Sequence, residues 1–124
     1  MGTIQQLEHY LLLKLAHGET IMEYMYGLHA NENIPSLFKA SSLIVATNAR
    51  IYICSLVEEN FYCEEISYCD IQAIYHRERN LSGKESIIFI KEKRLTISHI
   101  EEGCPVKFMQ YVLKKRQKPF STTA

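Results

Sequence analysis

The side chains best suited to covalent chemistry are those of Cys69, Asp70 and His76, which lie close together in the chain. A nucleophilic cysteine needs a base that takes its proton and a third group that orients the base, and imidazole and carboxylate can fill these roles. The three residues fall, however, at a predicted junction between two strands, where an aspartate commonly hydrogen-bonds to the backbone of a turn. We therefore expect structural roles for them and no enzymatic activity.

A metal site is the second chemistry to consider, because the chain has four cysteines and five histidines. Structural zinc sites draw their ligands from closely spaced pairs such as Cys-x-x-Cys, but Cys63 and Cys69 are separated by five residues. The histidines are scattered at His9, His17, His29, His76 and His99. The five glycines are isolated, unlike those of a phosphate-binding loop. We expect no metal and no cofactor.

Basic side chains gather in the second half of the chain. Residues 1–66 carry eight acids and three bases, whereas residues 67–124 carry six acids and eleven bases, although the net charge is zero. The candidate anion-binding residues on the last predicted strands are Arg77, Arg79, Lys91, Lys93 and Arg94. Together they would attract an anionic membrane surface by roughly 1 kcal/mol per residue. Interleaved acids favour a solvated face instead, and no nucleic-acid-binding motif is present.

The amino terminus lacks the basic segment, long apolar core and cleavage site of a secretory signal. Its apolar cluster at residues 10–13 is far too short to span a bilayer, which takes about 20 residues. These features predict a cytoplasmic protein, either free or attached peripherally to a membrane. In a reducing compartment the four cysteines, Cys54, Cys63, Cys69 and Cys104, are expected to remain unpaired.

The elements that must position these side chains are short strands. Residues 41–74 are rich in β-branched and aromatic types interrupted by turn-forming residues, as successive antiparallel strands are. The full pattern predicts seven strands, at residues 19–30, 42–46, 51–57, 60–67, 71–79, 85–91 and 94–98. We expect Asn48 at positive φ in the turn after the second strand. Arg50 is expected to brace that turn through a carboxylate such as Asp70, and residues 31–39 are predicted as a loop.

A helix is predicted to open the chain. Thr3 and Gln6 match a capping box, and apolar residues recur at helical spacing up to His17-Gly18. The candidate residues for contact with a second copy of the chain, on or beside the main apolar stripe, are Leu7, Tyr10, Leu11 and Leu13. Packing against the core of the same chain is the alternative role for this surplus of apolar surface.

A second helix is predicted to close the domain. Pro105 suits its first turn, and its cationic end at Lys114, Lys115 and Arg116 suits a helix carboxyl terminus. The apolar arc that should face the strands comprises Val106, Phe108, Met109, Val112 and Leu113. The helix is expected to end near Lys118 and to leave a flexible tail at residues 119–124.

Three segments in order resemble the landmarks of bacterial pleckstrin-homology-like (PH-like) domains of the YokE-like type. They are Gly18-Glu19 before the first strand, LIVATNARIY at residues 43–52, and ISYCDIQAI at residues 66–74. The resemblance covers roughly residues 18–116. It implies an α+β, mainly β fold: a seven-stranded antiparallel sandwich or barrel capped by a carboxy-terminal helix. Residues 1–17 would add a further helix, and residues 18–118 would form the PH-like domain.

The resemblance also implies a small intracellular domain without catalytic apparatus, of a kind known to assemble into oligomers. We expect a binding or assembly module that associates with itself or with a protein partner. The alternative is peripheral attachment to an anionic membrane. Specific phosphoinositide binding is not expected, because the predicted loop after the first strand offers only Lys39 beside Glu32. A polyphosphate headgroup needs several charge-assisted contacts.

Overall fold

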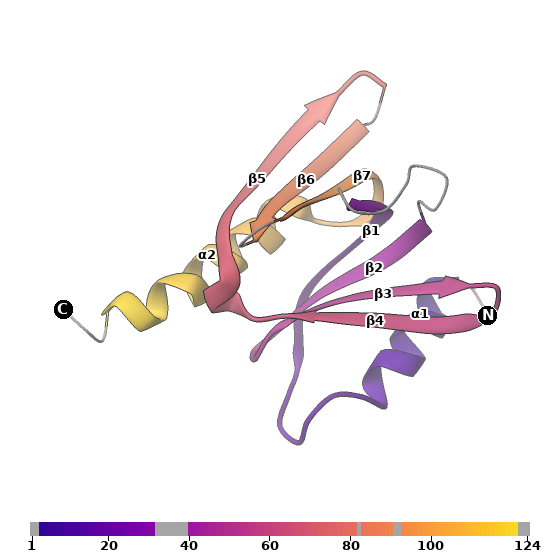
Figure 1. Cartoon of the computed structure of the whole chain (residues 1–124), viewed down its shortest axis with the longest axis horizontal. Coiled ribbons are helices and arrows are strands. Elements are labelled where there is room, and N and C mark those ends of the chain that lie inside the picture. The colour runs from indigo at the N-terminus through magenta and orange to yellow at the C-terminus, as the bar shows by residue number, and fades with distance from the viewer. Residues whose placement is uncertain (1–2, 32–39, 82, 91–92, 122–124) are drawn as a thin grey trace.

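The structure of the chain, a computed structural model, describes residues 3–31, 40–81, 83–90 and 93–121. Seven antiparallel strands and two α-helices make up this part of the chain (Figure 1). The elements in chain order are α1 (Thr3–Leu12), β1 (Ile21–Asn31), β2 (Ala40–Thr47), β3 (Ile51–Val57), β4 (Asn60–Ile66), the 3-10 turn η2 (Tyr68–Asp70), β5 (Ile71–Arg79), β6 (Gly83–Ile90), β7 (Lys93–Gly103) and α2 (Pro105–Ser121). The predicted strands and both predicted helices are therefore confirmed.

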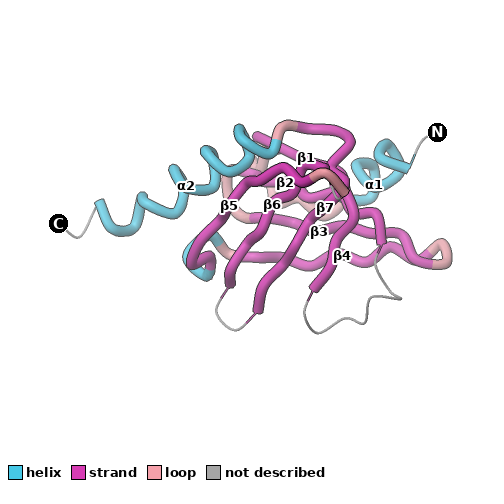
Figure 2. The backbone as a smooth tube through the Cα atoms, turned by 90° about the horizontal axis from the view of Figure 1, so that it is seen from above, coloured by secondary structure: helices cyan, strands magenta, loops and turns pink. Residues whose placement is uncertain are grey.

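The strands form one sheet in the order β4-β3-β2-β1-β7-β6-β5, so β1 lies in the middle and β4 and β5 form the edges. Figure 1 shows the strands on the two sides of β1 spreading apart, which gives the sheet the form of an open sandwich. Figure 2 shows the two helices at opposite ends of the sheet, and each packs in a core cluster of its own.

The pairing of β1 with β7 joins the two halves and contains a bulge between Tyr26 and Leu28. Gly27 lies in this bulge, where an added Cβ atom would come within 2.6 Å of the Ser98 carbonyl oxygen. The facing strand absorbs the irregularity at His99, whose φ of 51° is left-handed. This rearrangement extends β7 to Gly103, past the end at Ser98 that the sequence predicts.

The main core lies between the two halves of the sheet and is closed at one end by α2. Phe108 and Val112 of α2 are fully buried there, and Met109 and Leu113 pack against the same cluster. This placement confirms the predicted plugging role of the helix. The prediction was wrong for Val106, which is 38% exposed because it lies on the side of the first turn that faces solvent.

A second, smaller core lies on the outer face of β2, β3 and β4, where α1 covers it (Figure 1). Leu7 and Leu11 of α1 are fully buried in this cluster. Strands β2 and β3 are thus covered on both faces, with Ile44 turned to the main core and Val45 to the second. Two-sided burial explains why these strands read as continuous apolar runs rather than as alternating patterns.

Both helices end at positions other than those predicted. Helix α1 ends at Leu12 rather than near His17. A separate β-turn follows, closed by a hydrogen bond from the Glu19 N–H to the Ala16 carbonyl, and Gly18 takes the left-handed φ of 83° within it. Helix α2 continues to Ser121, past the predicted end at Lys118.

The two-residue turn between β3 and β4 carries the left-handed backbone of a hairpin. Glu58 and Glu59 have φ values of 51° and 69°, as both central residues of a type I′ turn require.

The predicted loop at residues 31–39 lies, apart from Asn31 in β1, outside the described residues. So do Ser82, Lys91, Glu92 and the last three residues of the predicted tail.

Candidate functional site

The carboxylate of Glu19 lies at the point where separate segments of the chain meet. Its Oε2 accepts a hydrogen bond from Thr47 Oγ1 at 2.6 Å, and its Oε1 accepts bonds from the Tyr52 hydroxyl and the Ala16 N–H, each at 3.0 Å. The Glu19 side chain is only 2% exposed. The first and second landmark segments are therefore in direct contact through this carboxylate.

Arg50 adds a cation to the same cluster. Its Nε lies 3.4 Å from Glu19 Oε2, and its Nη1 donates a hydrogen bond of 3.0 Å to Glu65 Oε1. The prediction that Arg50 braces the turn through a carboxylate is confirmed, but the carboxylates are those of Glu19 and Glu65 and not that of Asp70. Pairing of β3 with β4 sets Glu65 opposite Tyr52, diagonally across from Arg50, whereas Asp70 lies beyond the end of β4 in η2.

The turn at residues 47–50 is held by side chains rather than by a left-handed residue. Thr47 Oγ1 accepts hydrogen bonds from the N–H groups of Ala49 and Arg50. Asn48 Oδ1 accepts from the Thr20 N–H at 2.9 Å, and its Nδ2 donates to the Gly18 carbonyl at 3.2 Å. The prediction of positive φ at Asn48 was wrong, since the described non-glycine residues with that backbone are Glu58, Glu59 and His99.

The third landmark segment reaches the same place through Tyr68. Its hydroxyl donates a hydrogen bond of 2.5 Å to the Thr47 carbonyl oxygen. Burial raises the pKa of Tyr68 above its ordinary value, so the hydroxyl stays protonated and continues to donate. All three landmark segments thus converge on Thr47, and we call Glu19, Thr47, Arg50, Tyr52 and Tyr68 the landmark cluster.

The hydrogen bonds of the landmark cluster decide the charge of Glu19. Burial of the carboxyl opposes ionisation, but bonds from Thr47, Ala16 and Tyr52 together with the Arg50 charge outweigh it, and the pKa of Glu19 is lowered. Burial, reinforced by the bond to Glu19, raises the pKa of Tyr52 to about 12. The cluster therefore contains a fixed anion, a fixed cation and neutral phenols near neutral pH, which suits a structural junction better than proton transfer.

An open pocket of about 460 Å³ borders the landmark cluster, and it is lined by Ala49, Arg50, Glu65, Ile66, Ser67 and Asp70. Two acids and one base line it, and the base is already paired. The pocket is therefore poorly suited to an anion. Cys69 lies beside it, but its thiol is within hydrogen-bond distance of the Ser67 hydroxyl, at 3.0 Å. Among the described residues, no side-chain hydrogen bond joins the Cys69 thiol to Asp70 or His76.

The predicted basic residues are divided between two places. Arg77 and Arg79 lie near the β5–β6 turn, where their Nε atoms are 2.7 and 3.5 Å from Glu85 Oε1. Lys93 begins β7 at the opposite end of the neighbouring strand, next to Arg94. About five residues of β6 separate the two places, or roughly 15 Å of strand.

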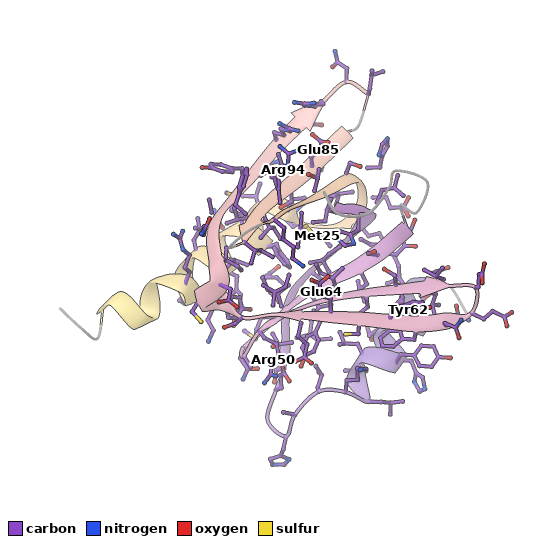
Figure 3. The ribbon with its side chains drawn as sticks, viewed as in Figure 1. Met25, Arg50, Tyr62, Glu64, Glu85 and Arg94 are labelled. Carbon is purple, nitrogen blue, oxygen red and sulfur yellow. The ribbon has the colours of Figure 1, made fainter. Side chains whose placement is uncertain are left out.

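The Lys93 ammonium is also paired. Its Nζ lies 2.6 Å from Glu64 Oε1, so this ion pair links β7 to β4 across the open sandwich. Figure 3 shows Glu64 between the two halves of the sheet. Arg94 is exposed but makes interactions of its own. Lys91 lies outside the described residues.

The four candidate contact residues, three on α1 and Leu13 directly after it, differ in the direction in which they face. Leu7 and Leu11 are fully buried against the sheet, whereas Tyr10 is 43% and Leu13 74% exposed. The Tyr10 ring lies 5.1 Å from that of Phe61 on edge strand β4. Tyr10 and Leu13 thus form an apolar surface beside a sheet edge, which we call the α1 patch.

A cavity of about 230 Å³ opens on the other side of α1, between the helix and the sheet. Its floor is mainly apolar, and Glu8 and Glu102 supply carboxylates. The remaining lining residues are Ile4, Gln5, Ile21, Tyr24, Leu43 and Val45. An apolar floor with acidic groups suits a protein side chain better than it suits a phosphate.

The described residues contain no group of three or more His, Cys, Asp or Glu side chains arranged around a metal ion. Among the same residues, neither helix combines the length and apolar character that crossing a membrane requires.

Sequence reasoning missed the role of Glu19, because a single acid before a strand has the pattern of an ordinary solvated residue. The available signal was the pairing of Gly18-Glu19 with Thr47-Asn48-Ala49-Arg50 in the resemblance. The two segments are about 30 residues apart in sequence. Only the folded chain therefore shows that the Glu19 carboxylate contacts Thr47 and Arg50.

Comparison with known proteins shows which family and which solved structures this chain is similar to. A family model described as "Bacterial PH domain" matches residues 15–114. Solved structures with the same fold include the Vps36 N-terminal PH domain, with a TM-score of 0.65, 16% identity and coverage of 86% of each chain. No curated protein matches the chain.

Two further structures are similar over nearly the whole chain. The C-terminal domain of an unknown protein from Leishmania infantum has a TM-score of 0.62 at 10% identity and covers 94% of this chain and 100% of its own. A DUF1696 family protein with a pleckstrin-homology domain from Shewanella loihica has a TM-score of 0.61 at 11% identity, with coverage of 93% and 94%. At these identities the similarity confirms the PH-like fold and nothing finer.

Proposed function

Because the chain belongs to the bacterial PH domain family, we propose that it is a non-catalytic assembly module that works by associating with further copies of itself. A protein partner of another kind would use the same surface. The family supplies the general character of a binding domain, and the geometry of α1 supports the finer proposal.

The observation that carries the proposal is the two-sided apolar character of α1. The inward side, with Leu7 and Leu11, is used up by the second core. The outward side still exposes Tyr10 and Leu12, and Leu13, directly after the helix, is 74% exposed. Exposed leucines grouped at the end of one short helix exceed what a monomer needs, because the apolar residues on an ordinary protein surface are scattered singly.

The position of the α1 patch also favours self-association. Tyr10 lies against Phe61 of β4, and β4 is an edge of the sheet with unpaired backbone groups. Edge strands pair readily with other chains unless they are protected. A second copy seated on the α1 patch would cover apolar side chains and the adjoining edge together.

Light scattering on purified protein at low micromolar concentration and above tests the proposal. We expect a mass above the 14.4 kDa of one chain. Leu13→Glu should shift the protein toward the monomer, because it places a charge in the contact. Leu81→Glu is the matched control, since Leu81 is 95% exposed in the β5–β6 turn, away from α1. A wild-type protein that stays monomeric when concentrated would rule out self-association.

Peripheral attachment to an anionic membrane is the second candidate. The C-terminal half of α2 extends past the strands in both views and carries Lys114, Lys115 and Arg116 (Figures 1 and 2). The ion pairs of Arg77, Arg79 and Lys93 reduce the charge available elsewhere. Co-sedimentation with acidic vesicles at low and high salt separates the two candidates. Absence of binding at low salt would exclude the membrane function.

A further inference from the structure

We propose that Cys54 and Cys63 form a redox-active dithiol that undergoes thiol–disulfide exchange with small disulfides such as oxidised glutathione. This proposal does not depend on the proposed assembly function. All four cysteines of the chain are free thiols in the structure. Cys54 and Cys63 differ from the other two because they touch each other.

Strand pairing brings the two thiols together. Cys54 on β3 and Cys63 on β4 are direct cross-strand partners, and their Sγ atoms are 3.6 Å apart. Directly paired residues in antiparallel strands have Cα atoms about 4.5–5.5 Å apart. That separation is within the range of about 4.4–6.8 Å that a disulfide spans. Bond formation therefore needs a change of side-chain rotamers and a small closing of the strands, not a change of fold.

The role of apolar filler accounts for only one of the two cysteines. Cys54 is fully buried in the second core, where a free thiol commonly serves as a small apolar side chain. Cys63 is half-buried at the rim of that core, on an edge strand. A small disulfide can therefore approach Cys63 from solvent, while Cys54 is positioned to react second.

The surroundings support Cys63 as the attacking thiol. The hydrogen bond from Cys54 lowers the pKa of Cys63, and it outweighs the opposing effect of burial, while the nearby Lys14 ammonium acts in the same direction. The same hydrogen bond and burial raise the pKa of Cys54. The thiolate is the nucleophile in exchange, so the pair has one sulfur ready to attack and a second that is protonated until the first has reacted.

The reaction balances without any other oxidant. The Cys63 thiolate attacks one sulfur of the small disulfide, forms a mixed disulfide and releases one thiolate. Cys54 then loses its proton to solvent and attacks the Cys63 sulfur, which expels the second thiolate. The protein dithiol is oxidised to the Cys54–Cys63 disulfide, and the small disulfide is reduced to two thiols.

The resulting bond should be easy to reduce again. Cys54 and Cys63 are close in sequence, so a crosslink here closes a short loop and stabilises the fold less than a crosslink over a long loop would. Weakly stabilised or strained disulfides have the more oxidising potentials that are typical of regulatory bonds. Because Leu7 and Leu11 pack in the same cluster as Cys54, oxidation takes place directly beneath α1.

The test is oxidation of the folded protein by oxidised glutathione, followed by unfolding in denaturant, alkylation with N-ethylmaleimide and peptide mass spectrometry. Unfolding is needed because Cys54 is fully buried in the folded chain. We expect joint loss of alkylation at Cys54 and Cys63, with a linked peptide and an intact mass lower by two hydrogen atoms. Cys69 and Cys104 should remain alkylated in the same molecules. Oxidation of Cys69 or Cys104 at the same rate, or no Cys54–Cys63 link, would overturn the proposal.

A trapping variant tests the order of the two steps. In Cys54→Ser the second step is blocked, while the hydroxyl can still donate a hydrogen bond to Cys63, so glutathione should remain attached to Cys63 instead of being released. Cys104→Ser is the matched control, a change at a half-buried cysteine outside the pair, and it should still form the Cys54–Cys63 link. Circular dichroism confirms that Cys54→Ser is folded, and the wild-type measurement decides the proposal if it is not. An unmodified Cys63 in folded Cys54→Ser would contradict the mechanism.

Discussion

Glu19 shows how a single residue can hold distant segments together. A buried carboxylate is costly unless hydrogen bonds and an opposite charge compensate for the loss of water. Here the hydroxyls of Thr47 and Tyr52, the Ala16 N–H and Arg50 provide that compensation. If Glu19 were removed, these donors would be left buried without an acceptor. The carboxylate and its donors therefore stabilise the fold only together.

Replacement of Glu19 should therefore destabilise the fold strongly. Glu19→Ala leaves buried donors unpaired, and we expect a loss of about 2 to 4 kcal/mol in the free energy of unfolding. Glu19→Gln keeps an oxygen acceptor and should cost less, about 1 kcal/mol. Urea denaturation measures both, with Glu101→Ala, an exposed glutamate of β7, as the control. A Glu19→Ala midpoint equal to that of the control would show that the landmark cluster does not support the fold.

Helix α1 is the element whose two sides have different roles. Its inner side completes the second core over β2, β3 and β4, and its outer side forms the α1 patch. Periodicity shows that the helix is more apolar than one core requires. It cannot show which leucine faces which layer, because that depends on the angle at which the helix lies on the sheet.

Truncation should have very different effects at Leu11 on this helix and at Leu13 directly after it. Leu11→Ala empties a fully buried site, and we expect a loss of about 2 to 4 kcal/mol in the free energy of unfolding. Leu13→Ala removes an exposed side chain and should change the free energy by less than about 0.5 kcal/mol when measured on monomeric protein. Thermal or urea unfolding of the two variants at low concentration distinguishes them. Similar losses for both would mean that α1 packs in another orientation.

The β1–β7 pairing is the second element-scale feature, because it joins the two halves of the sandwich. We expect Gly27→Ala to cost about 3 kcal/mol, since the new methyl group would meet the Ser98 carbonyl, a backbone atom that cannot turn aside. Gly18→Ala is the contrast. Gly18 has φ of 83° and open space around it, so only backbone strain of about 1 kcal/mol is expected. Equal unfolding midpoints for the two variants would contradict this steric account.

At the scale of the whole molecule, titratable groups from the two halves of the sandwich interact with one another. His29 of β1 lies near the ion pair between Glu64 of β4 and Lys93 of β7. Burial lowers the pKa of His29, and Glu64 and Lys93 act on it in opposite directions. Its Nε2 is buried without a hydrogen-bond partner. A neutral imidazole is therefore the form that the folded chain favours.

Stability should fall in two stages as the pH is lowered. The unfolded chain binds a proton at His29 near pH 6.5 while the folded chain resists it, so stability is lost below that pH. The pKa of Glu19 is lowered from 4.5, so its contribution is present above pH 4.5 and is lost as the pH falls through the folded value. Urea midpoints across this range at constant ionic strength measure both stages.

Matched variants assign the two stages to their groups. His29→Gln should flatten the stage that begins near pH 6.5 and leave the acid stage in place, whereas His17→Gln, at an exposed histidine, should change neither. Glu19→Gln should reduce the acid stage. A wild-type midpoint that stays constant between about pH 7 and pH 5 would rule out a contribution from His29.

The strands and helices could be predicted from the sequence because the buried positions of each element hold apolar residues, and these follow one another within a short segment. Strand β3 at Ile51–Val57 and strand β5 at Ile71–Arg79 have the predicted bounds. The end of β7 was missed because it depends on a bulge opposite Gly27, and the turn at Asn48 was misassigned because its bonds go to Gly18 and Thr20. Both errors come from partners that are distant in sequence.

The amino-acid sequence alone thus determined the class of fold, the order of the elements and the family resemblance, because hydrophobic period and turn chemistry act over a few neighbouring residues. Tertiary structure alone decided that Glu19 binds Thr47, that Arg77 and Arg79 share Glu85, and that Cys54 touches Cys63. These contacts depend on register and on the crossing of strands. Both are set by the packing of the whole chain and leave no periodic signal in any one segment.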